Sequence, residues 1–244
     1  MTLLLRDRAY LPIAELCRRF RISEATARRD LDALSKQRTV VRTFGGAMGD
    51  YNRRFAPFSD RLKLAAAAKT RIAKLAIEQL EPGMTVFIDA GTTLYILAQL
   101  LAKEPLTSLV VVTNSLAVAE KLAPVDQIEV NLTGGTLLAK QSVLLGRAAN
   151  ESVKFYQFDF ALLGAEAFND EGVWNSADNV VELQHAVMSR SSRHAVCVDA
   201  RKLDKTAPSK LAAWDDVDLL ISDAPLTDVH AAGVMMEKKN YLIA

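Results

Sequence analysis

From residue 63 onward, short apolar runs alternate with segments of helical periodicity, and this alternation leaves few folds open to the chain. The runs occupy residues 86–88, 109–112, 128–132, 160–163, 195–198, 219–221 and 241–243. Helical periodicity is found over residues 64–80, 93–103, 116–123 and 180–190. Continuous apolar strands are typical of a parallel sheet that helices cover on both faces. Residues 63–244 are therefore predicted to form a Rossmann-like, mostly parallel α/β domain.

Polar or glycine-rich turns directly follow five of these runs. The carboxyl ends of parallel strands lie along one edge of a sheet, and ligands of open α/β folds bind in the crevice there. We therefore expect the turns to converge on one small-molecule site. The candidate residues are Asp89, Gly91, Thr92, Thr93, Thr113, Asn114, Ser115, Gly134, Gly135, Gly164, Asp199 and Lys202.

The turn at Gly91–Thr93 has the composition of a phosphate cradle. It opens a predicted helix, so free backbone N–H groups, two hydroxyls and the positive end of the helix dipole can hold an anion together. Glycine lets the backbone approach a ligand closely. Lys202, after a later strand, can neutralise a phosphate charge or lie in a solvated loop.

Glu182 and His185 form a further candidate pair. They lie three positions apart on a predicted helix, so they share a face. The pair can hydrogen-bond a polyol, act as an acid and a base, or be a plain surface pair. Because the three histidines are scattered and no Walker loop or dinucleotide fingerprint is present, neither a metal nor a nucleotide cofactor is expected.

The N-terminal segment has the pattern of a helix-turn-helix. Leu3–Leu5 look like the end of a first helix, and a second is predicted from Pro12, a residue suited to the first helical position. Ser23 is suited to cap a third helix, in which Ala27, Leu31 and Leu34 share one face. The opposite face is cationic and free to enter a DNA groove. The residues predicted to face DNA are Ser23, Thr26, Arg28, Arg29 and, from the segment that follows, Arg42.

That following segment, residues 39–44, is rich in β-branched residues and is predicted to be a strand that ends at Gly45–Gly46. Residues 1–47 are accordingly expected to form a winged helix-turn-helix. Residues 48–62 lack periodicity and are the predicted linker.

The charge is divided unevenly along the chain. Residues 1–63 hold fourteen Lys or Arg against seven Asp or Glu, while the remainder holds 16 against 22. A basic N-terminal quarter on an acidic body favours binding of a polyanion by the N-terminal part, although charge alone is equally compatible with a solvated surface. No apolar run is long enough to span a bilayer or to serve as a signal peptide, so a cytoplasmic protein without membrane contact is expected.

Residues 23–31 (SEATARRDL) and 42–47 (RTFGGA) resemble the DNA-binding signature and wing of the DeoR family of bacterial repressors. The resemblance continues through residues 87–93, 112–116, 132–135, 146–149 and 159–164. It departs at Phe44, where the family has a wing histidine, at His185, where it has a lysine, and in the shorter segment before Leu3.

The resemblance implies a winged helix-turn-helix joined to a sensor domain similar to ribose-5-phosphate isomerase and CoA transferases. It further implies a repressor of a carbohydrate-catabolism operon that binds operator DNA and responds to a phosphorylated sugar. A homodimer or homotetramer is expected, because two recognition helices must reach successive major grooves. Two alternatives are a sugar-phosphate isomerase-like enzyme that uses Asp89, Glu182 or His185 as proton carriers, and a helix-turn-helix that docks to protein.

Overall fold

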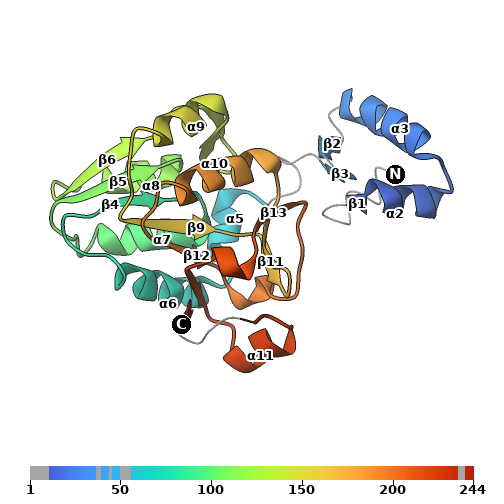
Figure 1. The fold of residues 1–244 in the computed structure, drawn as a ribbon. Coiled ribbons are helices and arrows are strands. Elements are labelled where there is room, and N and C mark those ends of the chain that lie inside the picture. The colour runs from blue at the N-terminus through green and yellow to red at the C-terminus, as the bar shows by residue number, and fades with distance from the viewer. Residues whose placement is uncertain (1–10, 37–39, 44–45, 50–55, 236–239) are drawn as a thin grey trace.

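A computed structural model of the chain describes residues 11–36, 40–43, 46–49, 56–235 and 240–244 (Figure 1). The predicted end of a first helix at Leu3–Leu5 and the glycine at position 45 lie outside these residues.

The larger part of the chain is built on a seven-stranded sheet of order β15-β14-β12-β9-β4-β5-β6. All neighbouring strands are parallel. The strands are β4 (Thr85–Ile88), β5 (Leu109–Thr113), β6 (Ile128–Leu132), β9 (Phe160–Gly164), β12 (His194–Cys197), β14 (Leu219–Ser222) and β15 (Tyr241–Ile243). Each apolar run identified in the sequence contributes one of these strands, which confirms the predicted parallel α/β fold.

Helices cover both faces of this sheet (Figure 1). Strand β4 shows the division, because Val86 and Ile88 pack with α6 (Ala66–Ile77), α7 (Thr92–Leu101) and α8 (Leu116–Leu122), whereas Phe87 packs with α9 (Arg147–Val153) and α10 (Asp178–Met188). Burial on both faces explains why the strands are apolar at successive positions rather than at alternate ones.

Several short elements outside the main sheet were not predicted from periodicity. They are the hairpin of β7 (Thr136–Leu138) and β8 (Val143–Leu145), the antiparallel sheet of β10 (Ala167–Asn169), β11 (Gly172–Asn175) and β13 (Ser209–Ala212), the 3₁₀ turns η1 (Ala200–Lys202) and η2 (Trp214–Asp216), and α11 (Leu226–Ala231). These strands are three or four residues long, and most of them lack the continuous apolar run that marks the equally short β4, β12 and β14.

The N-terminal part contains β1 (Leu11–Pro12), α2 (Ile13–Phe20), α3 (Glu24–Lys36), β2 (Val40–Thr43) and β3 (Gly46–Gly49). Its strands form an antiparallel sheet of order β1-β3-β2, which supplies the wing. Leu16, Ala27 and Leu31 are each at most 1% exposed and join α2 to α3. Ser23 caps α3 as predicted, because its Oγ accepts a hydrogen bond from the Thr26 backbone N–H at 3.2 Å.

Two boundary predictions are corrected. The strand predicted at residues 39–44 corresponds to β2, but the wing extends past the predicted boundary at residue 47, because β3 runs from Gly46 to Gly49 and pairs with β2 and β1. The segment predicted to be linker contains α5 (Phe58–Lys63), a helix too short to show an apolar stripe.

Candidate functional site

The order of the central strands creates a crevice at one edge of the sheet. The chain runs from β4 outward to β5 and β6, and later places β9 on the opposite side of β4. Ligands of open α/β sheets bind where the strand order reverses in this way. A pocket of about 500 Å³ lies there, lined by residues 89–94 after β4, residues 164–167 after β9, and parts of 197–207 after β12.

A buried hydrogen-bond network, formed by Asp89, Gly164, Asn175 and Gln184, closes the inner side of this pocket. Asp89 Oδ2 accepts from Gly164 N at 3.1 Å and from Gln184 Nε2 at 2.7 Å. Asn175 Nδ2 in turn donates to Gln184 Oε1 at 2.7 Å. Burial raises the pKa of Asp89, against hydrogen bonds from Gly164, Gln184, Ala90 and Asn114 that lower it. The carboxyl group therefore organises the pocket, since its oxygens already accept bonds from the protein.

The N-terminus of α7 opens into the same pocket through Gly91, Thr92 and Thr93. Gly91 has φ +147° and ψ 158°, a conformation nearly restricted to glycine, and no side chain caps the helix. An atom at the Cβ position of Gly91 meets nothing within 4 Å. The first turn of α7 therefore has no side-chain cap and adjoins the pocket, as an anion site at a helix N-terminus requires.

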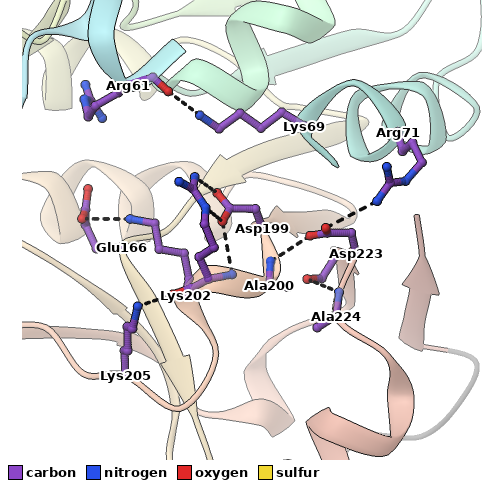
Figure 2. Close-up of polar contacts among 12 residues, drawn as sticks. Arg61, Lys69, Arg71, Glu166, Asp199, Ala200, Lys202, Lys205, Asp223 and Ala224 are labelled. Carbon is purple, nitrogen blue, oxygen red and sulfur yellow. Dashed lines mark hydrogen bonds and ion pairs between the residues drawn. The ribbon is translucent and has the colours of Figure 1, made fainter. Parts of the chain in front are cut away.

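Five basic residues, Arg61, Lys69, Arg201, Lys202 and Lys205, line another side of the pocket and are called the cationic cluster below (Figure 2). Among the described contacts, Arg201 and Lys202 pair with carboxylates. Arg201 Nε donates to Asp199 Oδ1 at 2.7 Å, and Lys202 Nζ lies 3.3 Å from Glu166 Oε2. With Asp89 as the third acid, basic side chains outnumber acidic ones around the pocket. The pocket therefore favours an anion.

Lys69 is the most buried member of the cationic cluster, at 3% exposure. Its pKa is lowered to about 8, mainly by burial and also by the charges of Arg201, Arg61 and Lys202, while the charge of Asp199 opposes the shift. Its Nζ donates to the Arg61 carbonyl oxygen at 2.6 Å (Figure 2). Burial likewise opposes ionisation of Asp199, but the hydrogen bonds and charge of Arg201, with Lys202 and Lys69, hold its pKa below the usual value. The pKa values of Lys69 and Asp199 therefore depend on the neighbouring charges, and the charge of a bound ligand will shift them as well.

The pocket contains eight of the effector-site residues predicted from the sequence: Asp89, Gly91, Thr92, Thr93, Asn114, Gly164, Asp199 and Lys202. Thr113 and Ser115 are fully buried beneath it and do not line it. Thr113 Oγ1 donates to Ile88 O at 2.6 Å, and Ser115 Oγ accepts from Val118 N at 3.3 Å as the cap of α8. Their hydroxyls support the turn after β5.

Gly134 and Gly135 also lie outside the pocket lining. They follow the edge strand β6, two strands away from β4, so the turn is too far from the strand reversal to reach it. Gly135 has φ +124°, and a Cβ there meets the Leu145 carbonyl oxygen at 2.6 Å. This glycine is needed for close backbone packing against β8.

Glu182 and His185 are exposed on α10 and do not line the pocket. His185 Nε2 instead lies 2.5 Å from Leu211 O in β13. Val180 and Gln184 are the residues of α10 that line the pocket, and the polar one, Gln184, is 1% exposed. It shares an apolar stripe with Val181 and Val187, so a polar residue at a core position was the signal for it.

Arg61 and Lys69 also line the pocket but were not among the site residues predicted from the sequence. Lys69 lies on the stripe that contains Ile72, Ala73 and Ala76, where a lone lysine among core positions marks a functional group. Arg61 belongs to the segment predicted to be linker, and no local pattern identifies it.

The DNA-facing residues predicted on α3 lie on its solvent side. Arg28 and Arg29 are exposed, and Arg28 Nε donates to Glu24 Oε1 at 3.0 Å. The Ser23 and Thr26 hydroxyls lie 2.9 Å apart at the start of the helix. Arg42 belongs to β2, and its side chain lies outside what the structure describes.

A winged helix-turn-helix followed by an α/β domain with an anion-favouring pocket defines a ligand-responsive DNA-binding regulator. Residues 1–51 match the DeoR-like helix-turn-helix domain, and residues 64–224 match the DeoR C terminal sensor domain. The chain belongs to the DeoR family and is a DNA-binding transcriptional regulator.

Two relatives that are named transcriptional repressors support this assignment. The chain is 30% identical to the glycerol-3-phosphate regulon repressor of Escherichia coli K12, over 93% of either chain. It is 30% identical to the transcriptional repressor GlcR of Bacillus subtilis 168, over 86% of this chain and 80% of the relative. Both relatives are regulators by name.

Two solved structures align with part of the chain. A D-ribose-5-phosphate isomerase in complex with phospho-erythronic acid aligns with a TM-score of 0.41 and 19% identity, over 55% of this chain and 52% of the other. The eIF2B beta subunit from Chaetomium thermophilum aligns with a TM-score of 0.48 and 14% identity, over 70% and 61%.

Within the described residues, no helix has the length and hydropathy needed to cross a membrane. The same residues contain no group of three or more His, Cys, Asp or Glu side chains placed to hold a metal ion.

Proposed function

We propose that this regulator represses a carbohydrate-catabolism operon and that a phosphorylated sugar bound in the pocket controls its affinity for operator DNA. In this proposal the DNA-binding part extends through Gly49 of β3, and the part that begins with α5 senses the ligand. One relative, the glycerol-3-phosphate regulon repressor, has a name that couples repression to a phosphate ester.

The observation that carries the proposal is the meeting of the cationic cluster and the α7 N-terminus in one pocket. A phosphate needs several N–H donors and positive charge, and both are present there. The amide and carboxyl groups of Asn114, Asn175 and Glu166 line the same space and suit sugar hydroxyls. A volume of about 500 Å³ is in the range of small-molecule sites.

A sensor rather than a catalyst is supported by the arrangement of possible proton carriers. Glu182 and His185 lie outside the pocket, and Asp89 is held by backbone and amide donors. General acid–base catalysis needs a carrier within hydrogen-bond reach of the substrate. The three proton carriers named for an isomerase are therefore not placed to act, and the regulator names of the relatives favour a sensor.

A thermal-shift screen tests the ligand class. Each phosphorylated sugar, together with sn-glycerol 3-phosphate and inorganic phosphate, is compared with its unphosphorylated parent. A ligand at 100 times its Kd adds about 2.7 kcal/mol of stability, and we expect this only for phosphate esters. Stabilisation by parent sugars alone contradicts the proposal.

DNA binding is tested with an operator duplex selected from a random pool. We expect its affinity to fall steeply as salt rises, because Lys and Arg contacts to phosphates release counterions. Affinity independent of salt favours docking of the helix-turn-helix to protein. Sizing the complex on this duplex tests the expected homodimer or homotetramer.

A further inference from the structure

Helix α5 contributes one corner of the pocket, although it lies next to the DNA-binding part in the sequence. Only residues 50–57 separate β3 of the wing from α5. Arg61 of α5 and Leu64 directly after it line the pocket together with Gln141 and Val143 of the β7–β8 hairpin. A ligand in this pocket therefore meets the segment through which the chain reaches its DNA-binding part.

The contacts that hold α5 come from three different elements. Arg61 Nη2 donates to Gln141 Oε1 at 2.6 Å, and the Arg61 carbonyl oxygen accepts from Lys69 Nζ at 2.6 Å. The Phe58 ring packs edge-on against Tyr95 of α7 at 5.3 Å between centroids. Phe58 N also donates to Lys140 O at 3.2 Å. Two of these contacts involve Arg61 itself.

The same corner concentrates positive charge and polar donors. Arg61 is among the cations that lower the pKa of Lys69, so the two like charges lie close enough to repel. The buried Gln141 Nε2 has no hydrogen-bond partner among the described residues. A guanidinium carries five N–H donors, so Arg61 can bond Gln141 and an anion together. An anion placed here turns repulsion between Arg61 and Lys69 into shared attraction.

We propose that Arg61 is an effector-binding residue, and that an anion held between Arg61 and Lys69 fixes α5 against the sensor domain. This inference rests on the proposed function, because it assumes that the pocket binds a phosphate ester.

The test compares full-length Arg61→Met with Arg71→Met. Arg71, on α6, does not line the pocket, and its side chain is 53% exposed, 3.5 Å from Asp223 (Figure 2). Each variant is titrated calorimetrically with inorganic phosphate and with the ester that gives the largest thermal shift. Hydrogen exchange of residues 58–64 is measured with and without that ester.

We expect Arg61→Met to bind the ester about tenfold more weakly, the loss of one charge-assisted hydrogen bond. The ester should slow exchange in residues 58–64 of the wild type and of Arg71→Met, and not of Arg61→Met. If Arg61→Met binds the ester normally, or if the ester leaves exchange in the wild type unchanged, the role of α5 is wrong while the proposed function stands. If no phosphate compound binds the wild type, both are wrong.

Discussion

The basic side chains of α3 and those of the pocket carry the same charge in opposite surroundings. Arg28 and its partner Glu24 are 48% and 57% exposed, whereas Lys69 is 3% exposed and has a pKa near 8. An exposed i,i+4 ion pair contributes only about 0.3–0.5 kcal/mol, so a DNA phosphate can replace Glu24 at little cost. Desolvated cations that repel one another gain much more from an anion. Exposure thus suits α3 to a long polyanion, and burial suits the pocket to a small one.

The largest expected effect is a loss of ester binding at the pocket that leaves DNA binding by α3 unchanged. Gly91→Asp places a negative charge at the α7 N-terminus and a side chain at φ +147°, which costs about 1–3 kcal/mol in strain alone. We expect ester affinity to fall about 100-fold or more, measured by calorimetry. Gly91→Ala is the matched control, since its Cβ meets no atom within 4 Å. It shares the strain without the charge and should lose less. If the two variants lose the same ester affinity, the negative charge of the aspartate is not the cause of the loss.

On α3, Arg28→Ala and Arg29→Ala should each weaken operator binding by roughly 1–3 kcal/mol if the side chain reads a base edge. Fluorescence anisotropy with the selected duplex measures this effect. Ester affinity should stay unchanged, because neither residue lines the pocket. Unaltered operator affinity in both variants rejects the DNA-facing assignment of α3.

Lys69→Met should weaken ester binding about 10-fold or more at neutral pH, through loss of a charged donor. The wild type should also take up protons on binding. Free Lys69 is about half protonated at pH 8, and an anion raises its pKa, so up to about half a proton enters per site at pH 8. Below about pH 6, Lys69 is protonated in both states and its uptake ceases. Above pH 8, affinity should fall as pH rises.

Calorimetry at pH 8 in two buffers with different ionisation heats measures the uptake. Phosphate esters titrate near pH 6 and contribute little there. Lys69→Met should show no buffer dependence. If the wild type shows none either, Lys69 does not contact the anion.

Lys202→Ala should have the smallest effect. Its ammonium is paired with Glu166 and its side chain is 29% exposed, so its loss should lower ester affinity by at most about fivefold. Calorimetry under the conditions used for Gly91→Asp makes the comparison. If Lys202→Ala loses more ester affinity than Gly91→Asp does, the Lys202 ammonium rather than the backbone N–H donors holds the phosphate.

Features encoded locally were readable from the sequence, and features that depend on distant partners were not. The strand at residues 160–164 and the turn at 89–93 carry their own signal, since apolar runs and helix-opening glycines act over a few residues. Strand β13 pairs with β11, more than thirty residues away, and has no periodic pattern of its own. Arg61 likewise reaches the pocket only because α5 packs on the β7–β8 hairpin.

The α10 helix shows how a correct element can still give the wrong residues. Its position was predicted, but Glu182 and His185 point away from the sheet and Gln184 points toward it. Helical periodicity identifies the apolar stripe, and a polar residue within that stripe deserves more weight than a polar pair outside it.

The coupling of pocket to DNA is tested most directly by operator binding at increasing concentrations of the best phosphate ester. Wild type and Gly91→Asp are measured together by fluorescence anisotropy, with the unphosphorylated sugar as control. The ester should shift the wild-type operator Kd and the parent sugar should not, while Gly91→Asp should keep the operator Kd of the ester-free wild type as ester is added. A shift of equal size in Gly91→Asp, at equal ester concentrations, would contradict a controlling anion site at the α7 N-terminus.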